Sequence, residues 1–457
     1  MKKIITLLFL FSTMIGMAQN QADKMEWFRE AKFGMFIHWG VYSQIAGEWQ
    51  GKNGYSEFVM LNAKIPCKEY EKVAATMNPV KYNAEKWVKA AKDAGMKYLV
   101  YTSKHHEGFA MYHSKCSQYN IFDHTPFKRD PLKELGDACR KYGVKFGIYY
   151  SLGRDWHDPD VPTNWPTKGG RSNTWDFPDE DAKDINKYME RKAKPQIKEL
   201  LEMYNPDMIW FDTPDMTPAH QSKAIRKMIL DYNPNIIINS RIGNNQGDFK
   251  NIEQKQSDKI IKGDWEACIT MSRNWGYMKA DHAFKSPEKL VSMLVDIVSK
   301  GGNLLLNVGP TPLGELREEN LSRMKIIGKW LKTNGEAIYG THTWKTFGEE
   351  GDTPKQAVKV KTIKGLEDEV YDATEDLKSD IRFTSKDNCV YVIARNWFDN
   401  EVLVKNMAKN KANIKSIKLL GSSKKIDWKQ TSNHLTIGLP DNLKNDLHIY
   451  AFKVEMK

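Results

Sequence analysis

Short apolar runs and amphipathic stretches alternate along most of the chain, and this alternation constrains the fold more than any other feature. The apolar runs are rich in β-prone residues and predict strands buried on both faces; they span 32–40, 96–106, 144–153, 206–213 and 235–241. Between them, apolar residues three and four positions apart predict helices that end at Gly or Asn, at 84–95, 130–143, 184–205 and 220–233. Repeated βα units predict a parallel sheet, and their number favours a closed (β/α)8-like TIM barrel over an open doubly wound sheet.

The pattern changes after about residue 345. Short strand-like segments separated by Asn, Asp, Gly and Lys follow one another up to residue 455, with no helical pattern between them. This arrangement predicts an antiparallel β-sandwich. A chain of 457 residues is therefore expected to hold a barrel over 19–345 and a β-sandwich domain over 346–457, with the segment EEGDTPKQ (349–356) as the linker.

The first eighteen residues predict a signal peptide. Lys2 and Lys3 precede an apolar stretch, and Gly16 and Ala18 are spaced as the small residues before a cleavage point. The apolar part is shorter than the roughly 20 residues of a spanning helix, so cleavage after Ala18 is favoured over an uncleaved anchor. We expect a periplasmic or secreted protein that is not inserted in a membrane after cleavage.

The charge and cysteine content exclude few classes of protein. The formal net charge is +11, but lysines are scattered among acidic residues and form no stripe, so nucleic-acid binding is not predicted. Five cysteines, an odd number without a CxxC spacing, predict mostly free, buried thiols. The sequence does not indicate an oligomeric state.

Unusual side chains recur where the predicted strands end. Active sites of barrels lie at the carboxyl ends of the strands, so side chains at successive strand ends are expected to meet in one pocket. These residues are His38, Trp39, His105, His106, Tyr149, Tyr150, Trp210, Asp212 and Arg241. A single histidine at such a position is often a hydrogen-bonded core residue, but recurrence at several strands favours a common site.

Asp212 follows the apolar run MIWF. Side chains alternate along a strand, so Asp212 and Trp210 share one face. The carboxylate could cap a turn with Thr213 and Pro214. The favoured interpretation is a carboxylate held against an indole on the pocket floor, where it attacks or stabilises an electron-poor carbon.

If the carbon that Asp212 attacks belongs to a glycoside, hydrolysis requires a second carboxyl group as proton donor. Glu253 lies in a polar segment expected to be a loop after the fifth strand. Glu266 lies among aromatic and apolar residues that would raise its pKa by desolvation. The spacing of residues does not choose between these two glutamates.

The adjacent histidines in KHHEG raise the question of a metal site. Adjacent residues of an extended segment point to opposite sides, unlike the two histidines one helical turn apart in HExxH. A barrel metallohydrolase assembled from His38, His105, His106 and Asp212 is the alternative. Neighbouring Trp and Tyr residues ligate metals poorly, whereas neutral imidazoles both donate to and accept from hydroxyls. We therefore favour an uncharged polar ligand such as a carbohydrate, with no metal and no cofactor.

Several blocks, taken in order, resemble those of the α-L-fucosidases of glycoside hydrolase family 29. The resemblance covers Trp27 to Thr343 and is carried by WFREAKFGMFIHWGVYS, KHHEGFAMYHSK, FKRDPLKEL, FGIYYS, IWFD, WEACITMSRNWGY and GGNLLLNVGP. It implies a retaining exo-glycosidase, with an irregular (β/α)8-like barrel and a β-sandwich, that acts on a fucosylated oligosaccharide or glycoconjugate. A non-catalytic fucose-binding protein is a further alternative.

The resemblance also implies roles for individual residues. Asp212 is implied as the nucleophile and Glu253 as the acid/base, with Glu266 as the alternative acid/base. Residues implied to line the fucose pocket are His38, Glu57, His105, His106, Tyr149, Trp210, Arg241 and Trp275. The chain departs from the family pattern at Phe58, where many relatives have Trp, at the segment NIE that ends in Glu253, and at Thr213.

Overall fold

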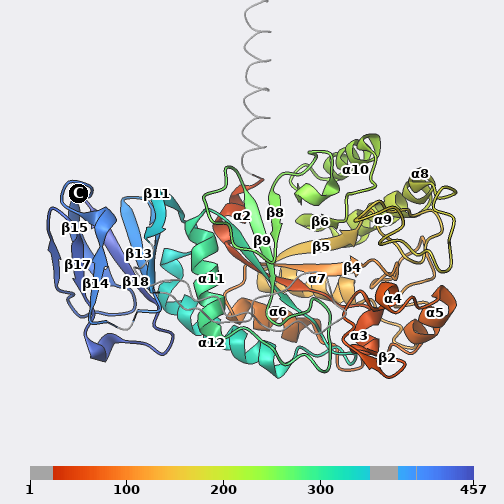
Figure 1. Cartoon of the computed structure of the whole chain (residues 1–457), viewed down its shortest axis with the longest axis horizontal. Coiled ribbons are helices and arrows are strands. Elements are labelled where there is room, and N and C mark those ends of the chain that lie inside the picture. Colours follow the sequence, from red (N-terminus) through yellow and green to blue (C-terminus); the bar gives the residue numbers. More distant parts are fainter. Residues whose placement is uncertain (1–23, 350–378, 398) are drawn as a thin grey trace, which may run out of the picture.

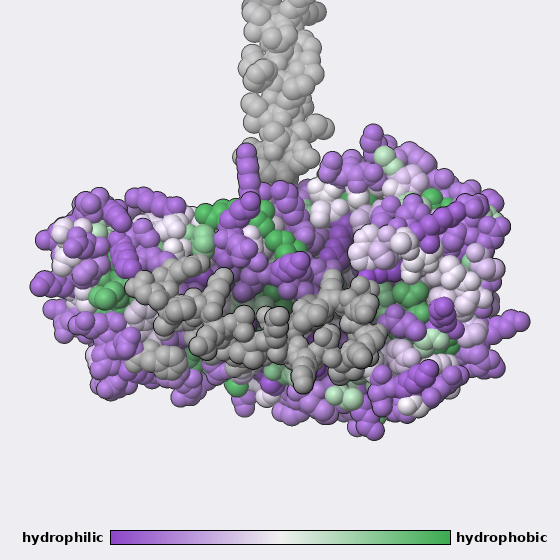
Figure 2. Space-filling view, in the orientation of Figure 1, coloured by the Kyte–Doolittle hydropathy of each residue, from purple (hydrophilic) through white to green (hydrophobic). Residues whose placement is uncertain are grey.

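The structure is a computed structural model that describes residues 24–349, 379–397 and 399–457. The predicted signal peptide and residues 350–356 of the predicted linker lie outside the described residues. Figure 1 shows the barrel at one end of the molecule and the β-sandwich at the other, with α11 (Pro287–Ser299) and α12 (Glu318–Asn334) between them. Apart from the grey atoms, hydrophilic side chains dominate the face in Figure 2. No described helix is long and apolar enough to span a membrane.

Eight parallel strands form the sheet of the first domain, in the order β7-β6-β5-β4-β1-β10-β9-β8. An isolated parallel bridge between Asn239 and Phe249 connects the two edges of this sheet, and the predicted (β/α)8-like barrel is confirmed. The strands are β1 (Phe33–Ile37), β4 (Tyr98–Lys104), β5 (Lys145–Ser151), β6 (Met208–Asp212), β7 (Ile237–Ile238), β8 (Lys250–Glu253), β9 (Trp265–Thr270) and β10 (Asn303–Val308).

Helices follow most strands, and local sequence signals fix their ends. The side chains of Asn83, Asp130 and Ser286 accept hydrogen bonds from backbone N–H groups three residues later, as N-caps do. The helices around the barrel are α2 (Glu26–Ala31), α6 (Ala84–Asp93), α7 (Pro131–Tyr142), α8 (Ile185–Tyr188), α9 (Lys194–Tyr204), α10 (Ala219–Tyr232), α11 and α12. A π-helical segment, Met189–Ala193, lies between α8 and α9 and ends two residues before Pro195, which has no N–H to donate to a regular helical hydrogen bond.

The connection after β1 builds one wall above the barrel. It contains three short helices and a two-stranded hairpin: α3 (Val41–Ile45), β2 (Glu48–Trp49), β3 (Lys52–Asn53), α4 (Val59–Asn62) and α5 (Cys67–Ala75). Glu57 and Phe58 lie immediately before α4 and line the barrel's cavity.

The region around Glu253 differs from the prediction. The fifth strand is only Ile237–Ile238 and gives way to a 3-10 turn, Ser240–Ile242. Glu253 was expected on a loop but is the last residue of strand β8. This strand is polar and half-exposed and forms its ladder with β9 alone, so it lacks the apolar run from which the other strands were predicted.

The C-terminal domain consists of two antiparallel sheets whose inner faces share one apolar core. The five-stranded sheet contains β11 (His342–Glu349), β12 (Asp380–Lys386), β13 (Cys389–Arg395), β18 (Tyr450–Met456) and β15 (Ile414–Leu419). The three-stranded sheet contains β14 (Glu401–Val404), β17 (Leu435–Gly438) and β16 (Trp428–Gln430). The expected boundary at residue 345 falls within β11.

Buried ion pairs connect this domain to the barrel. Asp296 on α11 accepts hydrogen bonds from Lys300 and from Arg382 Nε, each at 2.7 Å. Arg395 donates to Asp380 and to the backbone oxygen of Ser292. The contacts of Arg382 with Asp296 and of Arg395 with Ser292 cross from β12 and β13 to α11, so they join the two domains.

Candidate active site

A cavity of about 350 Å³ opens at the carboxyl ends of the barrel strands, the face on which this fold places its active sites. Every predicted site residue lines it except Trp39, Tyr150 and Glu266. Trp39 and Tyr150 were wrongly predicted to reach the pocket: both are fully buried, and their polar atoms donate away from it, to the backbone oxygen of Thr311 and to Gln196 Oε1. The lining residues are Phe36, His38, Glu57, Phe58, His105, His106, Tyr149, Arg154, Trp165, Arg171, Trp210, Asp212, Thr213, Pro214, Asp215, Arg241, Glu253, Cys268 and Trp275.

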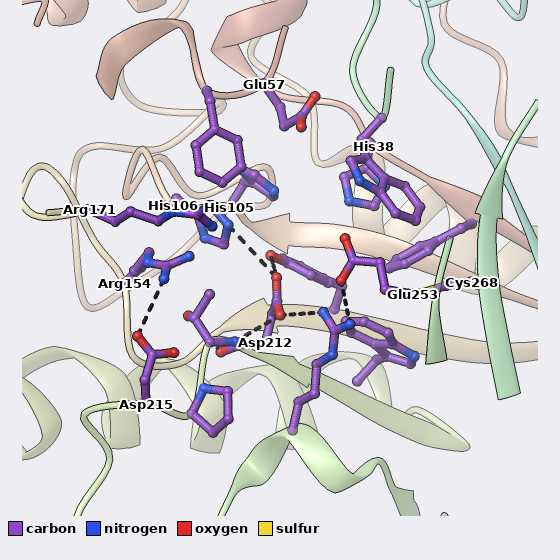
Figure 3. Close-up of a pocket in the computed structure, with 18 of the residues that line it drawn as sticks. His38, Glu57, His105, His106, Arg154, Arg171, Asp212, Asp215, Glu253 and Cys268 are labelled. Atoms are coloured by element: carbon purple, nitrogen blue, oxygen red, sulfur yellow. Dashed lines mark hydrogen bonds and ion pairs between the residues drawn. The ribbon is translucent and has the colours of Figure 1, made fainter. Parts of the chain in front are cut away.

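Asp212 ends β6 and projects into the centre of this cavity (Figure 3). Arg241 Nη1 donates to Asp212 Oδ1 at 2.7 Å, and the Tyr149 hydroxyl donates to Oδ2 at 2.9 Å. Burial alone would raise the pKa of Asp212, but the charge and hydrogen bond of Arg241 outweigh burial and hold that pKa below its ordinary value. Asp212 is therefore an oriented, ionised carboxylate.

Arg241 contacts a second carboxylate as well. Its Nη2 donates to Glu253 Oε2, so one guanidinium bridges Asp212 and Glu253 (Figure 3). The guanidinium also lies 5.0 Å from the centroid of the Trp210 ring. The two carboxyl groups predicted for catalysis thus face the same cavity, separated by the width of one guanidinium.

His38 is held as a neutral hydrogen-bond acceptor. Asn307 Nδ2 donates to the backbone oxygen of Trp275 at 2.8 Å, which leaves Asn307 Oδ1 to accept from His38 Nδ1 at 2.7 Å. Burial lowers the pKa of His38 to about 4. At neutral pH the ring therefore carries its proton on Nδ1 and offers the lone pair of Nε2.

His106 is arranged in the same way. Ser151 donates its only hydroxyl proton to the backbone oxygen of Arg154 at 2.9 Å and accepts from His106 Nδ1 at 2.7 Å. Burial, followed by the charge of Arg154, lowers the pKa of His106 well below its ordinary value. Its Nε2, which keeps its lone pair, lies 3.8 Å from Asp212 Oδ2. Both atoms are hydrogen-bond acceptors, and both face the same part of the cavity.

Aromatic rings and a further carboxyl group complete the wall. His105 stacks on Tyr149 with centroids 5.5 Å apart, and Tyr149 stacks on Trp210 at 5.6 Å. Trp275 lies 4.9 Å from the His38 ring. Glu57 is buried, its Oε2 accepts from the Gly276 backbone N–H at 3.1 Å, and burial raises its pKa.

Glu266 does not reach the cavity. It is the second residue of β9 and is fully buried. Its Oε2 accepts from the Tyr98 hydroxyl at 2.5 Å, and its Oε1 accepts from Trp210 Nε1 at 2.8 Å and Asn251 Nδ2 at 3.3 Å. Burial raises the pKa of Glu266 to about 7. Through its hydrogen bond with Trp210 Nε1, the carboxyl group holds that indole in position.

Sequence reasoning missed several lining residues. Arg154 follows β5 by three positions and could have been found by extending the strand-end rule. Trp165 and Arg171 lie farther along the irregular segment 152–184, where no periodicity indicates which side chains point inward. Cys268 lines the cavity from β9, where burial raises the pKa of its thiol well above the ordinary value.

No group of three or more His, Cys, Asp or Glu side chains in the described parts of the chain is arranged to hold a metal ion. The imidazoles of His38 and His106 instead donate from Nδ1 to neutral side chains and present single acceptors. A paired carboxylate site with aromatic walls and many acceptors, at the carboxyl end of a barrel, defines a glycoside hydrolase.

Comparison with protein families agrees with this class. The family model "Alpha-L-fucosidase" matches residues 15–336, and the model "Alpha-L-fucosidase C-terminal domain" matches residues 374–455. The chain belongs to the α-L-fucosidase family.

Individual relatives match over two thirds of the chain or more. Plasma alpha-L-fucosidase of Homo sapiens is 30% identical over 443 residues, which cover 91% of this chain and 85% of that protein. The structure of alpha-L-fucosidase isoenzyme 1 from Paenibacillus thiaminolyticus superposes with a TM-score of 0.79 at 31% identity, covering 96% of this chain and 100% of that one. Alpha-L-fucosidase AlfC from Lactobacillus casei, solved in complex with alpha-L-fucose product, has a TM-score of 0.65 at 38% identity and covers 69% of this chain and 99% of its own.

Proposed function

We propose that this α-L-fucosidase releases terminal L-fucose from fucosylated glycans by double displacement, with Asp212 as nucleophile and Glu253 as acid/base. The observation that carries the proposal is the bridge of Arg241 between these two carboxylates. A retaining glycosidase needs two carboxyl groups about 5 to 5.5 Å apart, one ionised and one able to exchange a proton.

In the first step, the Asp212 carboxylate attacks C1 of the fucosyl residue and forms an ester, while Glu253 donates its proton to the departing glycosidic oxygen. Asp212 then carries no charge and Glu253 becomes anionic. The negative charge has moved from one partner of Arg241 to the other, so the same guanidinium stabilises it before and after the step.

In the second step, Glu253 removes a proton from water, and the resulting hydroxide attacks C1 from the side that the aglycone left. The bond to Asp212 breaks, its carboxylate is restored beside Arg241, and Glu253 regains its proton. Two inversions at C1 give net retention of configuration.

The acceptor-rich walls fit a ligand with many hydroxyl donors. Neutral His38 and His106 offer Nε2 lone pairs, and Glu57 adds carboxyl oxygens. We assign these groups, together with His105, to the hydroxyls of L-fucose, which has no charge to be desolvated. The rings of Phe36, Tyr149, Trp210 and Trp275 supply apolar surface for the sugar's C–H face and methyl group.

Glu253 is preferred to Glu266 as the acid/base because of where each carboxyl group lies. Glu253 is the last residue of its strand and lines the cavity. Both oxygens of Glu266 already accept hydrogen bonds from protein groups. A proton donor must come within hydrogen-bond reach of the leaving oxygen, and this requirement favours Glu253.

We also propose export of the protein to the periplasm or the medium, on the basis of the composition of residues 1–18. The N-terminal sequence of the protein recovered from its native cells tests this directly. A mature N-terminus at Gln19 supports the proposal, and a chain that keeps residues 1–18 contradicts it.

The proposed mechanism is tested by following hydrolysis of an aryl α-L-fucoside by proton NMR before the sugar mutarotates. Retention predicts the α-anomer of L-fucose as the first product. The Asp212→Ala variant should fold and lack turnover. The β-anomer as first product, or full activity of the variant, would refute the assignment.

A further inference from the structure

The connection between β5 and α8, residues 152–184, contains no regular helix or strand. Connections between strands and helices of α/β units usually have about 2–6 residues, and much longer irregular ones are commonly functional. Three side chains of this segment line the cavity: Arg154, Trp165 and Arg171. The steps proposed above use none of them.

Buried hydrogen bonds hold this segment in place. The indole of Trp156, which is fully buried, donates to the backbone oxygen of Arg171 at 3.1 Å. Asn173 Nδ2 donates to the backbone oxygen of Trp156 at 2.7 Å. The Arg171 guanidinium in turn lies 3.7 Å from the centroid of the Trp165 ring. Trp165 is therefore a preformed platform, and little conformational entropy is lost when a ligand stacks on it.

The open surface of Trp165 suits a sugar ring. Trp165 lines the cavity and is 47% exposed, although Arg171 covers part of its ring. An indole presents a broad apolar face with a negative electrostatic potential, and pyranose rings carry C–H groups on one side that complement such a face. A second sugar residue of the substrate would remove this apolar surface from water.

Arg154 has hydrogen-bonding capacity that the protein does not use. It is only 5% exposed, and its Nη2 donates to Asp215 Oδ2 at 3.3 Å, longer than the roughly 2.7–2.9 Å usual for such charged pairs. Its buried Nε has no hydrogen-bond partner among the described residues. Thr163 links Trp165 to Asp215: its Oγ1 accepts a hydrogen bond from the Trp165 backbone N–H at 3.3 Å and donates one to Asp215 Oδ2 at 3.5 Å.

These side chains adjoin the groups assigned to fucose at His106, whose pKa the charge of Arg154 helps to lower. Arg154, Arg171 and Asp215 lie on one side of Asp212, and His38 and Glu253 lie on the other (Figure 3). Because Arg154 is already paired with Asp215, the region offers donors and acceptors together and no isolated charge. Such a mixed surface matches the hydroxyl groups of a neutral sugar.

We propose that Trp165, Arg154 and Asp215 form a subsite for a second, neutral pyranose residue of the substrate, which stacks on Trp165 and exchanges hydrogen bonds with the Arg154–Asp215 pair. The proposal rests on the proposed function, because it assigns the substrate's second sugar to the same cavity. It makes Trp165 a determinant of which fucosylated glycans are cleaved.

The test compares substrates with and without a second sugar. α-L-Fucosyl fluoride has no second ring, whereas fucosyl disaccharides of the different linkages do. In the Trp165→Ala variant, kcat/KM should fall about tenfold for the disaccharide that the unmodified enzyme cleaves best, which corresponds to about 1.4 kcal/mol, and change less than about twofold for the fluoride. Asp215→Asn should show the same selectivity with a smaller loss. Trp428→Ala, which removes a 37% exposed indole from β16, is the matched control and should change neither value.

Three outcomes would overturn the subsite: equal losses on both substrates, no loss on the disaccharide, or an unmodified enzyme that cleaves the fluoride but no disaccharide. Failure of the proposed function gives a different result, because the unmodified enzyme would then hydrolyse neither substrate.

Discussion

Replacing Arg241 by Gln removes the cation shared by Asp212 and Glu253 while keeping a polar side chain. The two guanidinium nitrogens make charge-assisted contacts, one at 2.7 Å with Asp212 and one with Glu253. A hydrogen bond to a charged group contributes about 1.5–3 kcal/mol. In the proposed mechanism, at least one such contact stabilises the negative charge in each step. The value of kcat/KM should therefore fall about 10- to 150-fold, at about 1.4 kcal/mol per factor of ten.

The same substitution should change the pH profile in a defined direction. Burial raises the pKa of Asp212, and Arg241 opposes it. Without the cation, burial prevails, and Asp212, the proposed nucleophile, becomes protonated at higher pH. The acidic limb of kcat/KM against pH should therefore move to higher pH, and part of the lost activity should return in more alkaline buffer. The Arg241→Lys variant keeps the charge but cannot reach both carboxylates in parallel, so its loss should be intermediate.

The assay is hydrolysis of an aryl α-L-fucoside across the acidic and neutral range, with thermal unfolding to confirm that each variant is folded. Arg226→Gln is the control, because Arg226 has the same side-chain exposure, 20%, and pairs with Asp248 at 2.7 Å outside the cavity. An Arg241→Gln enzyme with the wild-type pH profile, or with no greater loss than the control, would refute the shared-cation argument.

Further predictions concern the second carboxyl group, the domain junction, the buried histidines and metal dependence. In the Glu253→Ala variant, kcat should fall about 10²- to 10⁴-fold on substrates with poor leaving groups, and azide should restore part of this activity. The Glu266→Ala variant should be less stable, and azide should not restore its activity. Restoration by azide in Glu266→Ala alone would reverse the assignment. Asp296→Ala leaves Arg382 and Lys300 without their buried carboxylate, so it should lower the unfolding free energy by about 3–5 kcal/mol and leave kcat unchanged. The control Asp137→Ala breaks exposed ion pairs and should lower the unfolding free energy by about 1 kcal/mol or less. Equal losses in the two variants would contradict a structural role for the junction. Burial lowers the pKa of His38 from 6.5 to about 4. Its contribution to stability is therefore present above pH 6.5 and is lost as pH falls towards about 4, because the unfolded chain takes up the proton first. In the His38→Asn variant the unfolding free energy should decline less steeply over that pH interval, and an unchanged slope would contradict this argument. Activity should be unaffected by dialysis against EDTA, and a loss restored by a divalent cation would support the metallohydrolase alternative.

The strand-end rule found most of the site because it depends on a repeated pattern. His38, His105 and Tyr149 each follow an apolar run, and parallel strands carry their last residues to the same face of the barrel. The rule could not separate Glu253 from Glu266. Glu253 is the last residue of β8 and Glu266 the second residue of β9, so strand boundaries decide which one reaches the cavity, and these are the least certain part of a sequence-based prediction.

Other features required the three-dimensional structure. The strand that carries Glu253 is polar because it pairs in a ladder on one side only, and a polar strand looks like a loop in sequence. Trp165 reaches the cavity from an irregular segment whose path depends on buried contacts of Trp156 and Asn173. Such tertiary contacts leave no periodic signal in the sequence.

Labelling with 2-deoxy-2-fluoro-α-L-fucosyl fluoride tests the central claim most directly, because the fluorine slows the second step and lets the glycosyl-enzyme accumulate. Peptide mass spectrometry of the inactivated protein should find one fucosyl adduct, on the peptide that contains Asp212 and on that side chain. An adduct on another carboxylate, or turnover of natural substrates by protein fully labelled elsewhere, would contradict the account.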